Sequence, residues 1–419
     1  MRNKTLRVLI ILIPALLIVM VALLFILKTQ KAGHTEAETA LSSEEISDSN
    51  DADNTSDADS DLGNDSTSSK DSATGDDANT PPEEPKSATL VFTGDILLGD
   101  RTLPLYQASG IDGILSNDLQ NLMNSADICM VNEEFPFSTR GVKAEDKQFT
   151  FRTDPVYVTA LTDMGIDIVT LANNHVLDYG TDALLDTFDT LDNAGIIYSG
   201  AGANATRAAE LETINANGID FGFLSASRVW PLASWEATDT NPGCFGTYDP
   251  AKLIAAIKEA RDKCDYLTVF VHWGIERQSH PEDYQVNMAK MYIEAGADLV
   301  IGSHPHCLQG IQFFDGKPVF YSLGNFIFGQ TTEKTAAIKV TVSENSSSTA
   351  NDSSSSASTD GSSSDNDLSL SAIYEVIPAA ASNAWTYQSE GDEAASLFSY
   401  FTSLSYGVTV DENGLVINN

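Results

Sequence analysis

The sequence A-D-L-V-I-G-S-H-P-H-C-L-Q-G occupies residues 297–310 and joins a short apolar run to two histidines. The run L-V-I at 299–301 is typical of a strand buried on both faces. His304 and His306 follow it, and Pro305 between them ends the strand and stiffens the turn. Open α/β sheets place their chemistry at the carboxyl ends of strands, and imidazole is the commonest transition-metal ligand. For one isolated H-P-H, however, a polar loop is the simpler interpretation.

The same arrangement of an apolar run followed by polar side chains occurs elsewhere in the chain. The strand candidates are 88–95, 127–134, 167–175, 265–274, 297–310 and 318–326. Their ends carry Asp95, Asn132, Glu134, Asn174, His175, His272, His304, His306 and Asn325. Four of the 6 histidines therefore fall at strand ends, where chance placement would scatter them. We expect one edge of a sheet to collect these side chains.

Helix candidates separate the strand candidates. They cover 179–194, 251–263 and 281–295, and glycines end the first and the third. Alternation of helices with buried strands predicts an α/β fold with a largely parallel sheet. After Asn325 the pattern changes, because 336–342 and 368–377 alternate like an antiparallel pair around a Ser-rich stretch at 343–367. We predict a disordered insertion there, then a helix at 392–404 capped by Asp392 and a last strand pair within 407–417.

The amino-terminal part differs from the rest in composition. Residues 8–27 carry no charge and follow a short basic head, which predicts an uncleaved signal anchor with the amino terminus in the cytoplasm. A cleaved signal peptide is the alternative. Residues 31–86 form an acidic Ser/Asp-rich segment that cannot bury a core, so we expect a disordered linker. The predicted organisation is therefore an anchor at 1–30, a linker at 31–86 and a folded domain at 87–419, at the cell membrane and facing outside.

Composition also limits the partners. The chain has 419 residues and a formal net charge of −37, so free nucleic acid is an unsuitable partner.

The polar strand ends suit a metal site. Carboxylate and amide oxygens together with imidazole nitrogens favour Mn, Fe or Zn, and either one ion or two ions could be bound. Each residue also has a simpler interpretation when taken alone. Asn173 and Asn174 are more often turn residues, and His272 within V-F-V-H-W-G is more often a hydrogen-bonded core histidine. Glu276 and Arg277 are more often a solvated surface pair, and His280 is a helix-start residue.

Taken together and in this order, the motifs resemble the CapA family of poly-γ-glutamate capsule biosynthesis proteins. They are T-G-D-I-L-L-G at 93–99, N-E-E-F-P at 132–136, L-A-N-N-H-V-L-D-Y-G at 171–180, H-W-G-I-E at 272–276, G-S-H-P-H at 302–306 and Y-S-L-G-N-F at 321–326. The resemblance implies a fold like that of calcineurin-like metallophosphoesterases, a two-sheet sandwich flanked by helices. The phosphoesterase D-x-H motif is altered here, because Leu97 stands at the histidine position, and Asn132-Glu133-Glu134 replaces G-D-x-x-D.

The resemblance also implies roles for individual residues. The implied metal ligands are Asp95, Glu134, Asn174, His272, His304 and His306. His175 stands at the catalytic histidine, with Asn174 beside it. Arg152 and Asn325 are candidate contacts to an anionic substrate, and we place Asn132 and Glu276 in the same group.

Two functions of different class follow. The first is a membrane-anchored capsule biosynthesis factor that engages an anionic, polyglutamate-like polymer and membrane-bound synthase subunits. The second is an extracellular metal-dependent hydrolase that acts on a phosphoester or amide bond. Most of the metal-binding set is present, which favours chemistry, whereas the missing D-x-H histidine favours a binding role.

Overall fold

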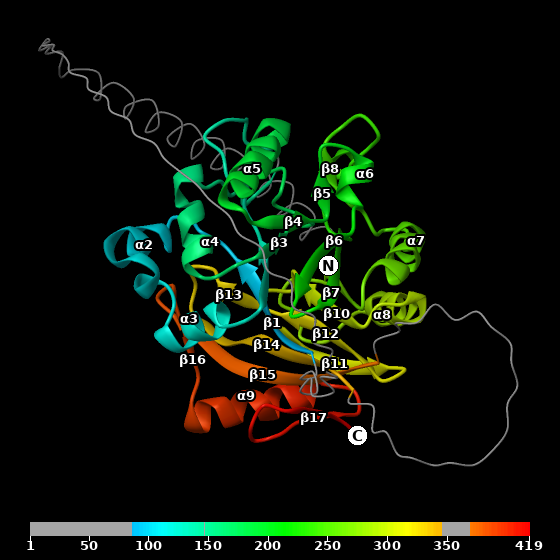
Figure 1. The fold of residues 1–419 in the computed structure, drawn as a ribbon. Helices are drawn as coiled ribbons and strands as arrows, with labels where there is room; N and C mark the ends of the chain where they lie inside the picture. The colour runs from blue at the N-terminus through cyan, green and yellow to red at the C-terminus, as the bar shows by residue number, and fades with distance from the viewer. Residues whose placement is uncertain (1–85, 146, 346–368) are drawn as a thin grey trace, which may run out of the picture. The chain divides into compact units, whose positions relative to one another are not determined.

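The computed structural model describes residues 86–145, 147–345 and 369–419, all within the compact unit Thr80–Asn419 (Figure 1). The predicted anchor at 8–27, almost all of the linker at 31–86 and most of the insertion at 343–367 lie outside the described residues. Among the residues described, no helix is both long enough and apolar enough to cross a membrane. The anchor and the linker therefore stay predictions.

Eight strands form the first sheet, in the order β16-β15-β14-β1-β2-β3-β4 with β13 beside β1. Strands β1 to β4 are parallel, whereas β14, β15 and β16 run antiparallel to their neighbours. The antiparallel pair predicted after Asn325 is thus confirmed as β14 and β15. The bounds are β1 (Ser87–Ile96), β2 (Ile128–Glu133), β3 (Ile168–Thr170), β4 (Ile197–Ser199), β13 (Asn325–Ile327), β14 (Thr332–Glu344), β15 (Leu370–Ser382) and β16 (Trp385–Gln388).

Six strands form the second sheet, in the order β11-β12-β10-β9-β7-β6. The four inner strands are parallel and the two edge strands are antiparallel to them, so both sheets are mixed rather than largely parallel. The bounds are β6 (Glu212–Ala216), β7 (Ile219–Ser227), β9 (Tyr266–His272), β10 (Leu299–Ser303), β11 (Leu308–Phe314) and β12 (Lys317–Leu323). Two short pairs complete the described strands, β5 (Ala201–Gly202) with β8 (Gly243–Cys244) and β17 (Val408–Val410) with β18 (Val416–Asn418).

The main core lies between the two sheets. Leu90 and Phe92 of β1 point into it from the first sheet, and Phe270 and Ile301 from the second, all at most 1% exposed. Burying side chains of this size stabilises the fold by about 1.5–3 kcal/mol each. Because alternate residues of a strand point to opposite faces, the other faces of both sheets carry apolar residues too, and helices must cover them.

Helices cover those outer faces (Figure 1). α2, α3, α4 and α5 pack with the first sheet, and α7 and α8 pack with the second. α9 contacts β11, β15 and β17. The helices are α2 (Leu103–Ser109), α3 (Asn117–Asn124), α4 (Thr159–Asp163), α5 (Gly180–Ala194), α6 (Ala205–Ala208), α7 (Ala251–Ala260), α8 (Asp283–Ala295) and α9 (Gly391–Leu404), with 3-10 turns η1 (Gly110–Gly113), η2 (Pro155–Val158), η3 (Ala233–Trp235) and η4 (Arg261–Lys263). The result is the two-sheet α/β sandwich flanked by helices that the motifs implied.

Three predicted boundaries need correction. α9 begins at Gly391 with Glu390 at the N-cap, so Asp392 lies in its first turn and is not the cap. α8 begins at Asp283, because Glu282 and Gln285 form a capping box that fixes its start two residues after Pro281. Ser343 and Glu344 belong to β14, since they pair with Ser371 and Leu370, and are not part of an insertion.

The segment that joins β14 to β15 provides a first test of the fold. Asn345 donates a backbone hydrogen bond to Ser369, and its side chain contacts the Ser369 hydroxyl at 2.8 Å. The strand ends are therefore already held together where residues 346–368 leave the sheet. Replacing 346–368 with a short Gly-containing turn should leave the melting temperature within about 5 °C, because loop length affects closure entropy only logarithmically. A larger drop, measured by differential scanning calorimetry, would show that the segment contributes packing.

Candidate metal centre

Carboxyl ends of strands from both sheets meet at one edge. Asp95 is paired in register with Asn132 of β2 and with Asn325 of β13. In the second sheet, Ser303 at the end of β10 is paired with His272 at the end of β9. The polar residues gathered here are called the strand-end cluster below: Asp95, Asn132, Glu134, Asn174, His272, His304, His306 and Asn325.

Gly94 explains how β1 reaches this edge. A β-carbon at position 94 would lie 1.9 Å from the carbonyl oxygen of Gly324, which is a clash with backbone. The absence of a side chain lets the Asp95 amide donate a 2.9 Å hydrogen bond to that same carbonyl. A glycine before Asp95 is therefore needed to place the aspartate beside the Gly324 turn.

Asn132 connects the two carboxylates of the cluster. Its Nδ2 group donates to Asp95 Oδ1 at 2.7 Å and to Glu134 Oε1 at 3.2 Å. Asn173 supports it from the next strand end, because its side chain donates to Asn132 Oδ1 at 3.1 Å and to the Glu133 carbonyl at 2.7 Å. Asn132 therefore lies in the cluster, as its place at the end of a strand predicted. Asn173 is not only a turn residue, because its buried side chain holds Asn132 in place.

Asp95, Glu134 and His272 could hold a metal ion. Their ligand atoms lie within 4.8 Å of one another, and all three side chains are buried. Glu134 Oε2 and His304 Nδ1 are buried with no hydrogen-bond partner among the described residues. Unpartnered buried polar atoms are costly, so two of them beside a carboxylate–imidazole group fit a site for a cation.

The other histidines complete the cluster. His306 Nδ1 lies 3.1 Å from Asp95 Oδ2 and 2.8 Å from Asn325 Oδ1.

His272 contacts Asn174 Oδ1 through Nε2 and the Ser303 hydroxyl through Nδ1, both at 2.9 Å. The His304 ring centroid lies 4.8 Å from that of His272 and 5.8 Å from that of His306. All six residues implied as metal ligands are therefore brought together.

The backbone of the H-P-H turn is strained. His304 has a φ of 97° and His306 a φ of 57°, a region that residues other than glycine rarely adopt. Such strain persists only where the surrounding structure enforces it, and it is concentrated at functional sites. The turn thus holds two imidazoles on an unfavourable backbone, with His306 against Asp95 and His304 beside the His272 ring.

Burial and neighbouring charge set the protonation of the cluster. Burial, with nearby positive charge, lowers the pKa of His272 well below its usual value and that of His304 to about 3. Burial also disfavours the charged form of His306, but the Glu134 and Asp95 carboxylates outweigh it and raise its pKa to about 9. Burial and the Asp95 charge raise the pKa of Glu134. His272 and His304 are therefore neutral, which is the form that binds a metal ion.

His175 belongs to a second polar group beside the cluster. Its Nδ1 atom lies 2.7 Å from Asp178 Oδ2, and the Lys147 ammonium forms an ion pair with Asp178 Oδ1. Lys147 also donates to the Asn174 carbonyl and lies 3.0 Å from His175 Nδ1. The shorter contact of Nδ1 is the one to Asp178, whose carboxylate can only accept, so it favours the tautomer with the proton on Nδ1 and with Nε2 able to take up a proton, whereas the Lys147 ammonium favours the other tautomer. Burial lowers the pKa of both His175 and Lys147.

Lys147 and Asp178 were not among the predicted site residues. The spacing of three residues between His175 and Asp178 was a usable signal, since it lets the two side chains meet on one turn of chain. Lys147 carried no such signal, because it lies in a loop distant in sequence from the motif it supports.

Two predicted substrate contacts lie outside these groups. Arg152 is exposed, donates to the Arg140 carbonyl at 2.8 Å and lies 4.1 Å over the Tyr179 ring. Glu276 is exposed, and no hydrogen bond to its carboxylate occurs within the described ranges. Neither touches the strand-end cluster, so only Asn132 and Asn325 of the four proposed contacts are in it.

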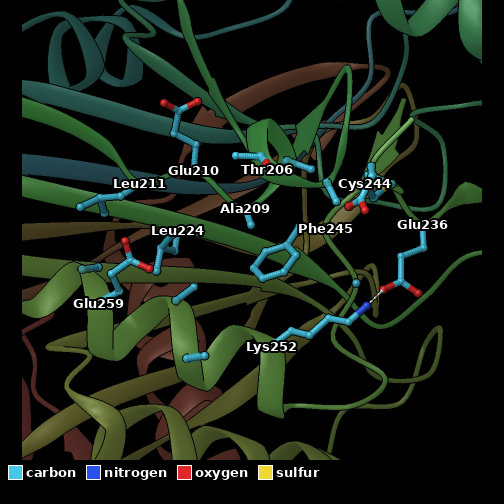
Figure 2. Close-up of a pocket in the computed structure, with 18 of the residues that line it drawn as sticks. Thr206, Ala209, Glu210, Leu211, Leu224, Glu236, Cys244, Phe245, Lys252 and Glu259 are labelled. Atoms are coloured by element: carbon cyan, nitrogen blue, oxygen red, sulfur yellow. Dashed lines mark hydrogen bonds and ion pairs between the residues drawn. The ribbon is translucent and has the colours of Figure 1, made fainter. Parts of the chain in front are cut away.

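A cavity of about 670 Å³ lies between α6, β8 and α7, apart from the cluster. Figure 2 shows Leu224 and Phe245 in its wall and the Lys252 ammonium directed at Glu236, a 2.6 Å ion pair. No residue of the strand-end cluster lines it. Cys244 connects the two regions, because its thiol lies 3.6 Å from the carbonyl oxygen of Asn173.

The fold and the cluster define a two-sheet α/β protein with a candidate metal site at its strand ends. Residues 89–330, more than half of the chain, match the family described as bacterial capsule synthesis protein PGA_cap. The chain belongs to this family, and the resemblance found in its motifs is confirmed.

Curated relatives agree with this assignment. The chain is 31% identical over 246 residues to the PGA biosynthesis protein CapA of Bacillus subtilis (strain 168), covering 58% of this chain and 64% of that protein. It is 30% identical over 275 residues to the capsule biosynthesis protein CapA of Bacillus anthracis, covering 63% and 66%. It is also 32% identical over 216 residues, 49% and 57%, to a probable polyglutamine synthesis accessory protein of Mycobacterium tuberculosis (strain ATCC 25618 / H37Rv). The match spans just under two thirds of the two CapA proteins.

Solved structures are similar only at a distance. An NAD nucleotidase from Haemophilus influenzae gives a TM-score of 0.40 at 10% identity, covering 77% of this chain and 64% of that one. A putative 5'-nucleotidase from Staphylococcus aureus in complex with alpha-ketoglutarate gives 0.39 at 14% identity, covering 62% and 51%. Likeness at this level carries no functional argument.

Proposed function

We propose that the chain is a membrane-anchored, outward-facing accessory protein of anionic polymer synthesis that binds one or two divalent metal ions at the strand-end cluster. Family membership and the names of the CapA relatives support a role in making a capsule polymer of polyglutamate type. The expected partners are the polymer itself and membrane-bound subunits of its synthase. The uncharged stretch at 8–27 supports the anchor and the extracellular position.

The observation that carries the metal proposal is the buried group of Asp95, Glu134 and His272 with its unpartnered neighbours. A cation held by these three residues would satisfy Glu134 Oε2 and offset the carboxylate charge. Imidazole with carboxylate and amide oxygen suits Mn, Fe or Zn. When bound, such an ion would supply positive charge that polarises an anionic group or a carbonyl beside it.

Metal-dependent hydrolysis of a phosphoester or amide is the second candidate function. Its support is the His175–Asp178 contact at 2.7 Å next to Asn174 of the cluster. A histidine whose Nδ1 is held by a carboxylate can exchange a proton through Nε2, which is the arrangement of a general acid or base. The contact between Asn174 and His272 would keep Asn174 in position beside His175.

Metal content and hydrolysis test these proposals together. We expect the purified full chain to contain close to one or two equivalents of Mn, Fe or Zn by mass spectrometry. Hydrolysis of phosphoesters or polyglutamate that stops after chelation would establish the hydrolase, whereas bound metal without hydrolysis would favour the accessory role. Absence of metal after reconstitution with each of the three ions would contradict the metal centre.

Topology needs its own experiment. Protease added to intact cells should cleave within 31–86 and release a fragment that contains the folded domain, because the acidic, polar composition of this segment cannot bury a core. A cytoplasmic marker protein should remain intact in the same cells. Protection of the whole chain until the membrane is permeabilised would show that the domain does not face outside.

A further inference from the structure

A groove of about 360 Å³ adjoins the strand-end cluster at His306 and Asn325. It continues from these two residues between the loop after β9, the beginning of β14 and α9. Those three segments contribute Arg277, Lys334 and Tyr400 to its walls. The groove therefore borders the strand-end cluster.

Two cations of this groove have no carboxylate partner. Within the described ranges, neither Arg277 nor Lys334 lies within 4.0 Å of an acidic oxygen, although Glu333 also lines the groove. Other described basic residues, such as Arg261 and Lys339, do form ion pairs. In a chain with a net charge of −37, two unpaired cations at one groove mark a place where an anion would be favoured.

The Lys334 side chain and the Arg277 backbone are each held by a specific contact. Lys334 lies 5.5 Å over the ring of Tyr400, a contact that attracts an ammonium group. Arg277 has a φ of 62°, and its amide donates to the Pro305 carbonyl at 2.7 Å. The strained turn that presents His304 and His306 thus also places Arg277.

We propose that this groove binds carboxylate groups of an extended anionic chain whose neighbouring unit lies at the strand-end cluster. The inference rests on the proposed function and adds Arg277 and Lys334 as contacts that select the ligand. Two cations on separate elements suit carboxylates repeated along a chain, whereas one phosphate would need its donors converging on one point. Thr331, Thr332 and Gln330 between them offer neutral groups that can hydrogen-bond the amides of such a chain.

Calorimetric titration of the full chain with glutamate oligomers tests the groove. Arg277→Gln and Lys334→Gln should each weaken binding about three- to tenfold, because each removes one charge-assisted contact at a partly solvated site. The affinity should also fall as salt concentration rises. Lys258→Gln, at an exposed position of α7 away from the groove, should bind like the parent. Arg277→Lys keeps the charge and should retain most of the affinity.

Each contrary result has a distinct meaning. Equal binding by the parent, Arg277→Gln and Lys334→Gln would overturn the groove but leave the proposed function intact. No binding of glutamate oligomers to the parent would overturn both. Equal affinity for a glutamine oligomer, or complete competition by inorganic phosphate at matched concentration, would overturn the assignment to a chain of carboxylates. Unchanged metal content and melting temperature in the variants would exclude misfolding as the cause of weaker binding.

Discussion

His304→Ala should remove bound metal while the domain stays folded. The imidazole has an unpartnered Nδ1 and no hydrogen bond among the described residues, so its loss breaks no polar network. The strand before it is held by Leu299, Val300 and Ile301, which are fully buried. Alanine also keeps the backbone at the same unfavourable φ, so the strain of the turn is unchanged. Metal affinity, measured by competition with a chelator, should fall at least about 100-fold, since loss of even an outer hydrogen-bond partner costs about 10–100-fold.

A matched histidine provides the control. His280 is exposed and lies outside the cluster, so His280→Ala should keep both the metal and the melting temperature of the parent. If His304 were a structural core histidine, its substitution would lower the melting temperature equally with and without chelator. Metal content in His304→Ala equal to that of the parent would end the hypothesis of a metal centre that includes His304.

Lys147→Met should destabilise the folded domain by about 3–5 kcal/mol, because it leaves the Asp178 carboxylate buried and unpaired. Asp178 is fully buried, and the Lys147 side chain is only 12% exposed. Asp178 also accepts a 2.7 Å hydrogen bond from the Phe151 amide. Movement of the unpaired Asp178 carboxylate would break this hydrogen bond and release the loop that covers His175. Denaturant unfolding measures the change in the free energy of unfolding.

A double-mutant cycle separates the pair from its parts. Asp178→Asn alone should also destabilise, and the double variant Lys147→Met with Asp178→Asn should lose less than the sum of the single changes. Lys143→Met is the control, because Lys143 is an exposed lysine of the same loop, and we expect a change within about 0.5 kcal/mol. Additive effects of the two single variants would show that the ion pair does not act as a unit.

Strand positions and the residues at their ends were predictable because they follow from local pattern. Leu299 to Ile301 is apolar at every position, which is typical of a strand or helix that is buried on all sides. The run is too short for a helix, so a strand was predicted. The parallel order then implied that Asp95 and Asn132 meet at one edge, and the structure places them there. His272 reaches the same place from the second sheet, which parallel order within one sheet does not predict. The antiparallel pair after Asn325 was equally clear from its alternation.

Other features depend on tertiary contacts that no local pattern encodes. Lys147 reaches Asp178 and Asn174 from a loop without secondary structure, so nothing in its own neighbourhood indicates the pairing. Arg152 and Glu276 were chosen by their proximity to motifs in sequence, yet their side chains are exposed. The start of α8 depends on the reciprocal bonds of Glu282 and Gln285, which outweigh the preference of Pro281 for a first turn.

The pairing of the first strand with late strands has a kinetic consequence. Ser87 of β1 is paired with Ser343 of β14, 256 residues further along the chain, and Asp95 is paired with Asn325. During synthesis, β1 therefore lacks its neighbours β13 and β14 until nearly the whole domain has emerged. Contacts this distant in sequence make folding slow and leave strand edges open in the meantime. The strand-end cluster is complete only when the chain up to Asn325 is in place, so acquisition of metal would report the end of folding rather than its beginning.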